Sequence, residues 1–224
     1  FTKYNLDFAN DILHMAELGF KQLSVEPVVT APEFPYALTE ADLPRVFDEY
    51  DKLYEIMKEK PDRFNFFHFK IDLDQGPCAI KRLRGCGCGN EYVAVTPDGE
   101  VYPCHQFVGM EQWKMGNIFD GVIDNKIKDY FAKTHIYSKE GCSECWARFY
   151  CSGGCNANSF QYEGDVQKPN RLACEMQRKR IECGIALEAV KKLQAATPHF
   201  LLPFLFDLKN VWGVRGKAPT KRVM

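Results

Sequence analysis

The sequence predicts an α/β segment followed by a cysteine-rich module. Helical and strand-like patterns alternate over the first 76 or so residues, as they do in a parallel α/β layer. Eight of the ten cysteines then lie between positions 86 and 174. We therefore expect three parts in this chain of 224 residues: an α/β portion over 1–76, the cysteine-rich module over 77–196, and a C-terminal tail over 197–224.

The first part begins with a helix and a strand. Apolar residues at helical spacing predict a helix over residues 5–18, with Asn5 as its N-cap and Gly19 as its stop. The sequence QLSVEPVV at residues 22–29 predicts a short buried strand. Glu26 ends this strand, and active-site groups of barrel folds lie at the carboxyl ends of strands. Glu26 is thus a weak catalytic candidate, against the alternative of an ion pair with a neighbouring lysine or arginine.

A second helix and strand follow. Thr39-x-x-Asp42 resembles a capping box, with Asp in place of the usual Glu, and opens a helix that runs to about Lys60. The apolar stripe of this helix consists of Leu43, Phe47, Tyr50, Leu53 and Met57. Residues 64–73 predict a strand, and its phenylalanines (Phe64, Phe66, Phe67 and Phe69) are interpreted as core. Two strands and two helices are too few for an independent α/β sheet. Because the chain also begins with Phe1, we expect it to be the C-terminal piece of a longer polypeptide.

The cysteine-rich module contains a predicted β-hairpin and two helices. Residues 91–96 and 100–103 flank the turn sequence Pro97-Asp98-Gly99, so they predict a hairpin that delivers Cys104 at its far end. We expect helices over 122–133 and 174–195, and a loop with short turns over 141–156.

Composition excludes several classes of function. A net charge of −1 gives no reason to expect nucleic acid or an anionic membrane as a partner. No apolar run approaches the ~20 residues that cross a bilayer. The N-terminal sequence FTKYNLDFANDIL is not a signal peptide. Ten cysteines without a secretory signal indicate a reducing, cytoplasmic location, where metal ligation is favoured over disulfides.

The cysteines fall into two sets. The downstream set reads Cys142-x2-Cys145-x5-Cys151-x3-Cys155 and ends with Cys174, whereas the upstream set is Cys86-x-Cys88 followed by Cys104. Four thiolates over so short a stretch can hold a structural zinc ion or a 4Fe–4S cluster. The residues alone leave three functions open: part of an iron–sulfur enzyme, a ferredoxin-like electron carrier, or a zinc-binding interaction module.

The spacing resembles the SPASM domain of radical S-adenosylmethionine enzymes. That family carries C-x(9–15)-G-x4-C, then CxxC-x5-CxxxC, then a final cysteine. Here Cys86, Gly99-x4-Cys104, the four cysteines from Cys142 to Cys155, and Cys174 supply these elements in order. The resemblance covers about residues 78–190. It implies that residues 1–76 are the closing half of a partial (β/α)6 TIM barrel.

The resemblance also implies two auxiliary 4Fe–4S clusters. Cys86, Cys104 and Cys155 would hold the first cluster, and Cys142, Cys145, Cys151 and Cys174 the second. Cys88 lies between Cys86 and Cys104, so it either completes the first site or leaves its fourth iron to an exogenous ligand. We expect the open site, in which the substrate thiol would bind.

The sequence QGPCAIKRLRGCGCGNEYVAVTPDGEVYPCHQFVG resembles thioether-forming peptide maturases, in particular those of six-cysteines-in-forty-five-residues (SCIFF) peptides. This implies a radical reaction that joins a cysteine sulfur of a ribosomal peptide to a carbon of an acceptor residue, a threonine in that group. Carbon–carbon crosslinking and sulfatase-type oxidation remain alternatives. The implied partners are a Cys-rich precursor peptide, the missing N-terminal half, and a reductant such as ferredoxin or flavodoxin.

The radical-generating triplet Cys-x3-Cys-x2-Cys does not occur in the sequence. The resemblance therefore assigns S-adenosylmethionine and a third 4Fe–4S cluster to the missing N-terminal half, and we expect this chain to be inactive alone. Other residues near the cysteines have weaker functional interpretations. Lys81, Arg82 and Arg84 form either a cationic loop near a cluster or a solvated loop, and His105 is either a hydrogen-bond donor or a surface histidine. Cys78 and Cys183 are interpreted as small apolar residues.

Overall fold

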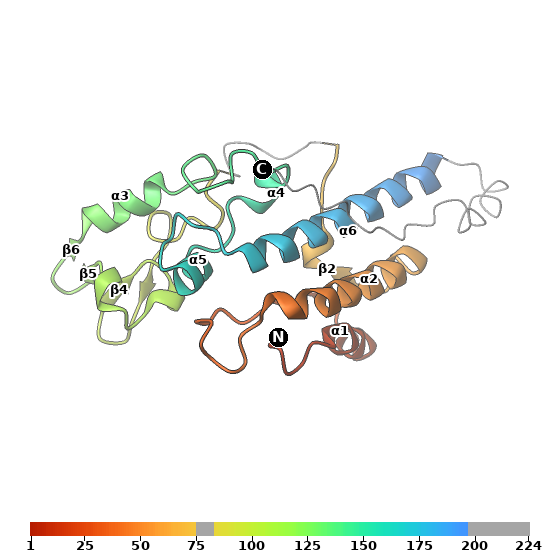
Figure 1. Ribbon diagram of the computed structural model, residues 1–224, viewed down its shortest axis with the longest axis horizontal. Coiled ribbons are helices and arrows are strands. Elements are labelled where there is room, and N and C mark those ends of the chain that lie inside the picture. The colour runs from red at the N-terminus through yellow and green to blue at the C-terminus, as the bar shows by residue number, and fades with distance from the viewer. Residues whose placement is uncertain (75–82, 197–224) are drawn as a thin grey trace, which may run out of the picture.

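The computed structural model describes residues 1–74 and 83–196. Figure 1 shows an elongated molecule, with a small four-stranded sheet at one end and a helical layer at the other. Helix α6 (Arg171–Ala196) runs alongside α2 (Leu43–Glu59). The predicted mixed α/β class is confirmed. The predicted tail, together with Cys78, Lys81 and Arg82, lies outside the described residues.

The first helix, α1 (Phe8–Glu17), is shorter than predicted at its start. Asn5 is not its N-cap, because the Asn5 side-chain oxygen accepts hydrogen bonds from the Thr2 amide and hydroxyl instead. Glu49 of α2 binds a free N–H group in the first turn of α1, since its carboxylate accepts the Ala9 N–H at 3.0 Å. Gly19 follows the last turn with φ of +98°, which confirms the predicted stop.

The predicted capping box is confirmed ahead of α2. The Thr39 N–H donates to Asp42 Oδ2 at 2.8 Å, and a single 3-10 turn, η1 (Glu40–Asp42), leads into the helix. The buried face of α2 includes Tyr50, Leu53 and Met57, as the apolar stripe predicts. Leu43 and Phe47 are only half-buried, and Val46 is buried in their place.

The strands of the α/β part are shorter than predicted. Strands β1 (Gln22–Leu23) and β2 (Asn65–Phe66) pair in parallel, which confirms the predicted topology, but each spans two residues. A 3-10 turn, η2 (Phe67–Phe69), replaces the expected continuation of β2. It turns the Phe67 side chain outward, so the prediction that Phe67 is core is wrong, with 67% of the residue exposed.

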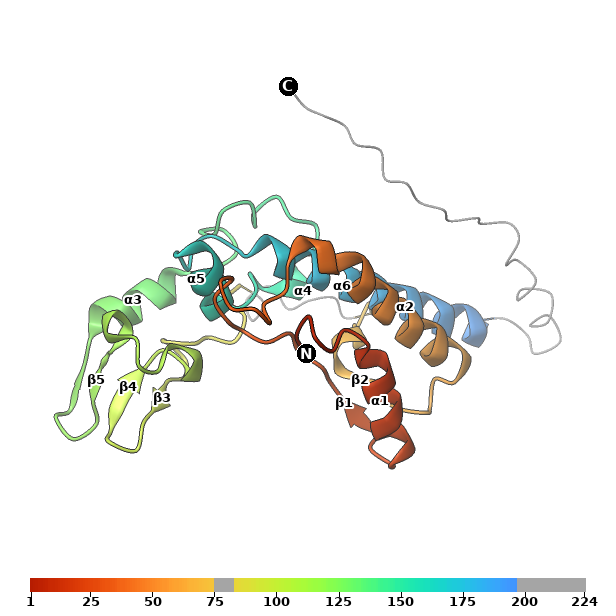
Figure 2. The ribbon, with the colours of Figure 1, turned by 60° about the horizontal axis from the view of Figure 1, so that its bottom comes forward.

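One apolar core joins α1, α2, the β1–β2 pair and α6. Its largest fully buried members include Phe8, Tyr50, Leu53 and Phe66. Gly184 of α6 permits the close approach of η2 to that helix, because a Cβ at this position would lie 2.6 Å from Ile71 Cδ1 and 2.9 Å from the Phe69 carbonyl oxygen. Figure 2 shows this helical layer from a second direction.

The cysteine-rich module is built on a small antiparallel sheet. Strands β3 (Ala94–Val95) and β4 (Glu100–Tyr102) form the predicted hairpin, with Gly99 in the left-handed turn at φ +81°. Strands β5 (Gly116–Asn117) and β6 (Val122–Ile123), which we did not predict, extend the sheet. Helix α3 (Asn125–Lys133) therefore starts later than predicted, at its N-cap Asp124.

The module also contains short helical segments. Two of them, η4 (His105–Phe107) and η5 (Glu111–Trp113), lie between β4 and β5, whereas α4 (Arg148–Cys151) and α5 (Asn156–Glu163) lie between α3 and the long helix α6. We predicted turns in the region of α4, but α5 was missed. The predicted last helix is confirmed and begins three residues earlier, at Arg171. Within the described residues, no helix is long and apolar enough to cross a membrane.

Candidate metal centre

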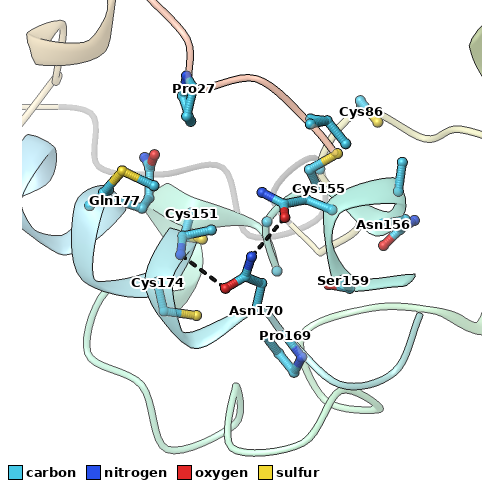
Figure 3. A pocket seen from close by; sticks show the side chains of 18 of the residues that line it. Pro27, Cys86, Cys151, Cys155, Asn156, Ser159, Pro169, Asn170, Cys174 and Gln177 are labelled. Carbon is cyan, nitrogen blue, oxygen red and sulfur yellow. Dashed lines mark hydrogen bonds between the residues drawn. The ribbon is translucent and has the colours of Figure 1, made fainter. Parts of the chain in front are cut away.

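One cavity brings together the cysteines of both sequence sets. It encloses about 1620 Å³ between the α/β part and the cysteine-rich module, and Glu26 lies on its wall. All eight cysteines of the two sets line it: Cys86, Cys88, Cys104, Cys142, Cys145, Cys151, Cys155 and Cys174. Figure 3 shows Cys155 near Cys86, and Cys151 near Cys174.

Their mutual electrostatic interactions divide the eight cysteines into two groups of four. Cys155 interacts with Cys86 and Cys104, and Cys88 contacts these same two thiols. We call these four the first group. Cys142, Cys145, Cys151 and Cys174 interact with one another, and we call them the second group. The side chains therefore lie in two neighbourhoods with the same members as the sets implied by the family resemblance, with Cys88 added to the first, and their role as cluster ligands stays a prediction.

Glycines shape the loop that carries Cys86 and Cys88. Gly85, Gly87 and Gly89 all have left-handed φ angles, between +65° and +75°. A Cβ on Gly87 would lie 2.7 Å from Glu91, and one on Gly89 would lie 2.6 Å from the Phe131 ring. The Gly89 N–H donates to the Pro103 carbonyl at 2.9 Å, so this loop is tied to the hairpin that ends in Cys104.

Three thiols of the first group are in contact. Cys88 is buried and forms hydrogen bonds with both Cys86 and Cys104, whereas Cys155 interacts with Cys86 and Cys104 only through charge. These bonds lower the pKa of Cys86 and of Cys104, and they raise the pKa of Cys88. Two further side chains serve the group: Asn156 Nδ2 donates to Cys88 Sγ at 3.3 Å, and the Tyr92 hydroxyl bonds to Cys86.

A reversal of the chain separates Cys151 from Cys155. Ser152, Gly153 and Gly154 have successive left-handed φ angles of +60°, +86° and +70°. Two cysteines only four positions apart therefore face different groups. The N–H groups of Gly153 and Gly154 bond to the Cys151 sulfur, whereas those of Ala157 and Asn158 bond to Cys155, which precedes α5.

The four cysteines of the second group are all half-buried. Burial raises the pKa of Cys142 and Cys151, and it raises the pKa of Cys174 to about 11. Arg178 of α6 forms a hydrogen bond with Cys145, so this group has a guanidinium next to one thiol.

Asn170 fixes Cys174 within the first turn of α6. Its side-chain oxygen accepts the Leu172 N–H at 2.9 Å, which is an N-cap bond, and its carbonyl accepts the Cys174 N–H at 3.0 Å. Its amide nitrogen donates to the Asn158 side-chain oxygen at 2.7 Å and so ties α6 to α5 (Figure 3). An asparagine just before a helical pattern is a recognisable N-cap signal, so the sequence contained the means to find this residue.

Lys139 lies between the two groups, and no sequence signal identified it. The residue is buried, and its Nζ donates to the Gly153 carbonyl at 2.9 Å. Burial lowers the pKa of Lys139, while Cys142, Cys155, Cys151 and Cys88 oppose that shift.

Glu26 is held by an ion pair, the alternative that the sequence analysis weighed. Arg180 Nη1 lies 3.2 Å from Glu26 Oε2, and His68 Nε2 lies 3.1 Å from Oε1. Arg180 is itself buried and donates to the Tyr50 hydroxyl at 2.7 Å. Burial, followed by the charge of Arg180, lowers the pKa of His68 to about 3. The Glu26 side chain nevertheless remains 61% exposed at the cavity wall.

The remaining candidates lie farther from the thiols or make weaker contacts. His105 lines the cavity and lowers the pKa of Cys104 only as a minor charge, after the bond from Cys88 and the Gln106 N–H. Arg84 is exposed and does not line the cavity. Cys183 is a member of the apolar core, where burial raises its pKa to about 12.

No three His, Cys, Asp or Glu side chains in residues 1–74 and 83–196 could hold a single metal ion as they stand. A 4Fe–4S cluster places irons and sulfides between its thiolates, so its ligands do not converge on one point. The absence of a converging set therefore argues against a zinc site in the described residues. It does not argue against a cluster, for which the number and type of the ligands are the relevant test.

Comparisons with known proteins concern part of this donor set, Cys86, Cys88, Cys104, Cys142 and Cys145. Residues 86–146 match the SPASM family model, described as an iron–sulfur cluster-binding domain. An uncharacterized protein of Archaeoglobus fulgidus is 28% identical over 96 residues, which are 42% of this chain and 23% of that protein.

Solved structures of anSMEcpe resemble the fold. Native anSMEcpe with bound AdoMet gives a TM-score of 0.61 at 20% identity, covering 88% of this chain and 55% of that one. The histidine-tagged form with AdoMet gives 0.58 at 22% identity, covering 92% and 56%. The form with AdoMet and a Kp18Cys peptide gives 0.54 at 22% identity, covering 85% and 56%. The chain thus spans about half the length of these structures. Residues 86–146 are similar to SPASM iron–sulfur cluster-binding domains, within a chain whose fold resembles that of anSMEcpe.

Proposed function

We propose that this chain is the auxiliary-cluster portion of a radical S-adenosylmethionine enzyme that modifies a ribosomally made peptide. The observation that carries the proposal is the division of the eight cavity cysteines into two groups of four. Four thiolates are the usual ligand set of one 4Fe–4S cluster. The AdoMet and peptide bound to anSMEcpe support the enzyme class, since the fold of this chain resembles that protein.

The donor chemistry of both groups fits such clusters. Each group offers four thiols, and main-chain N–H groups bond to the sulfurs of Cys104, Cys151 and Cys155. N–H donors near thiolates stabilise negative charge, which is one way in which proteins set cluster potentials. When bound, the clusters would supply a nearby acceptor and donor of single electrons.

The position of Cys88 favours a first group closed by four cysteines over the open site expected from sequence. Cys88 contacts both Cys86 and Cys104, and Asn156 donates to its sulfur. A Cys88→Ala variant tests this assignment. If Cys88 is a ligand, the variant's first cluster will convert to a three-iron form or be lost, whereas an unchanged cluster would restore the open-site interpretation.

The reaction we propose is thioether formation between a peptide cysteine and an acceptor carbon, with threonine as the expected acceptor. Joining S–H and C–H into a C–S bond removes two hydrogen atoms. S-adenosylmethionine accounts for one, taken as a hydrogen atom by the 5′-deoxyadenosyl radical. The other leaves as a proton and an electron, for which the clusters provide the acceptor. The resemblance of residues 75–109 to SCIFF-type maturases supports this choice over other peptide modifications.

The test uses the full natural polypeptide that carries this sequence, with S-adenosylmethionine, a reductant and a Cys-rich precursor peptide. A thioether predicts a product lighter by two hydrogens in which one thiol no longer reacts with an alkylating reagent. A carbon–carbon crosslink would leave every thiol reactive, and sulfatase-type oxidation would produce an aldehyde that a hydrazide captures. Either result would replace thioether formation with that alternative.

A further inference from the structure

Lys139 is a buried cation that belongs to neither cysteine group and lies close to both. Only 4% of the residue is exposed, and its Nζ donates to the Gly153 carbonyl, at the chain reversal that separates Cys151 from Cys155. Of the cysteines within electrostatic range, Cys142 and Cys151 belong to the second group. Cys155 and Cys88 belong to the first. A single ammonium therefore acts on both.

Within residues 1–74 and 83–196, no carboxylate forms an ion pair with Lys139. The acidic groups that act on it most strongly are the four cysteines. Taking an ammonium out of water is unfavourable unless an opposite charge is close by. Ionised thiolates, or the anionic clusters that they hold, are the negative groups that this position offers.

We propose that Lys139 is a shared electrostatic regulator, whose charge raises the reduction potentials of both iron–sulfur clusters together. This inference rests on the proposed function. Reduction adds negative charge to a cluster, so a nearby cation stabilises the reduced form. Because the ammonium is buried, salt in the solvent screens it weakly. The same charge also offsets repulsion between two anionic clusters that share one cavity.

Arg178 supplies a matched contrast to Lys139. It forms a hydrogen bond with Cys145 and interacts with Cys174, both of the second group. Its guanidinium is also paired with Glu175 at 2.6 Å. Arg178 should therefore affect the potential of the second cluster alone, whereas Lys139 should affect both. The two variants differ in the number of clusters that respond, which a general loss of folding would not reproduce.

The experiment measures both midpoint potentials by redox titration followed with electron paramagnetic resonance. It uses the full natural polypeptide, reconstituted anaerobically, as wild type, Lys139→Met, Lys139→Arg and Arg178→Met. Lys139→Met is expected to lower both potentials, by about tenfold in each reduction equilibrium, or about 59 mV for a one-electron couple. Lys139→Arg should keep both near their wild-type values, and Arg178→Met should lower only one.

Iron and sulfide counts separate the possible failures. If Lys139→Met keeps the wild-type cluster content and the reduction potential of one cluster or of neither changes, the role proposed for Lys139 is overturned and the proposed function is not. A wild-type protein without sulfide would overturn the proposed function and this inference together. If Lys139→Met loses its iron, Lys139→Arg decides. If Lys139→Arg retains both clusters, the positive charge at this position is what the clusters require. If Lys139→Arg also loses them, the proposed role of the charge is contradicted.

Discussion

The α/β part, together with helix α6 that packs on it, and the rest of the cysteine-rich module are stabilised in different ways. Eighteen buried apolar side chains form one core between α1, α2, the β1–β2 pair and α6. The module around the first cysteine group has a core of only seven buried residues, and two of these are Cys88 and Cys104. A third cluster of three residues backs the second group, with Cys145 and Cys151 packed against it.

This difference indicates where metal binding and folding are coupled. Apolar burial can account for the α/β part without a cofactor, because its core is continuous. The buried clusters of the module are smaller, its cavity is large, and thiols belong to these clusters or pack against them. Metal ligation supplies folding free energy in such domains. We therefore infer that the cysteine-rich module depends on its metal centres and that the α/β part does not.

Removal of iron should produce the largest effect. In the chelated protein we expect amides of the module, such as those of Gly89 and Met115, to lose their protection against hydrogen exchange. Amides of α2 should keep theirs, because that helix packs in the apolar core. Mass spectrometry of exchanged fragments measures both, and anaerobic reconstitution is the control. Equal loss of protection in the two regions would remove the distinction between them.

Leu53→Ala should weaken the α/β part. Leu53 is fully buried in the main core, so the truncation is expected to reduce the unfolding free energy by about 2–5 kcal/mol. The iron content under native conditions should stay unchanged, since Leu53 lies outside the cavity lining. Urea unfolding measures the loss, and Leu18→Ala at a site 62% exposed is the control. Loss of iron in folded Leu53→Ala would show that the module relies on this core.

His68 should make the α/β part sensitive to acid. Burial and Arg180 hold its folded pKa near 3, below the ordinary 6.5 of the unfolded chain. Between these two pKa values only the unfolded chain binds the proton. The contribution of His68 to the free energy of unfolding is therefore complete above about pH 6.5 and is lost as the pH falls. From about pH 7.5 to about pH 5 the expected loss is about 2 kcal/mol. Urea unfolding at several pH values should show this loss in the wild type and a smaller loss in His68→Asn. An equal pH dependence of the unfolding free energy in the two proteins would refute the prediction.

Asp42→Ala should have the smallest effect. It removes the carboxylate that accepts the Thr39 N–H ahead of α2, at an expected cost of about 1 kcal/mol. Thermal unfolding of this variant and of Asp42→Asn, which keeps an acceptor oxygen, gives the measurement. The same small loss in the absence of iron would agree with an α/β part that folds independently of the clusters. A loss of iron from Asp42→Ala would not.

The sequence predicted the elements whose signals are local. The hairpin turn at Gly99, the Thr39–Asp42 box and the stop at Gly19 each depend on a few neighbouring residues, and all were confirmed. Strand β1 ends at Leu23, earlier than predicted. Pro27, which has no N–H for a sheet ladder, lies four residues beyond that end and limits only the later part of the predicted strand. The contact of Glu49 with Ala9 joins residues 40 positions apart, which no local pattern encodes.

The same limit applies to the candidate site. Spacing alone places Cys155 beside Cys151, and the family resemblance was needed to move it to the first set. The structure supplies the physical reason in the three left-handed residues from Ser152 to Gly154. The contacts of Cys88 and the position of Lys139 depend on side chains packed from distant segments, so neither followed from the sequence.

The count of iron and acid-labile sulfide per chain tests the central claim most directly. The 224-residue chain should be reconstituted anaerobically and assayed together with Cys151→Ala and Cys183→Ala. We predict about eight irons and eight sulfides in the wild type, the content of two 4Fe–4S clusters. Cys151→Ala should retain about half of this, and Cys183→Ala all of it, since Cys183 lies in the apolar core. Stoichiometric zinc without sulfide would contradict the account and leave a structural metal module.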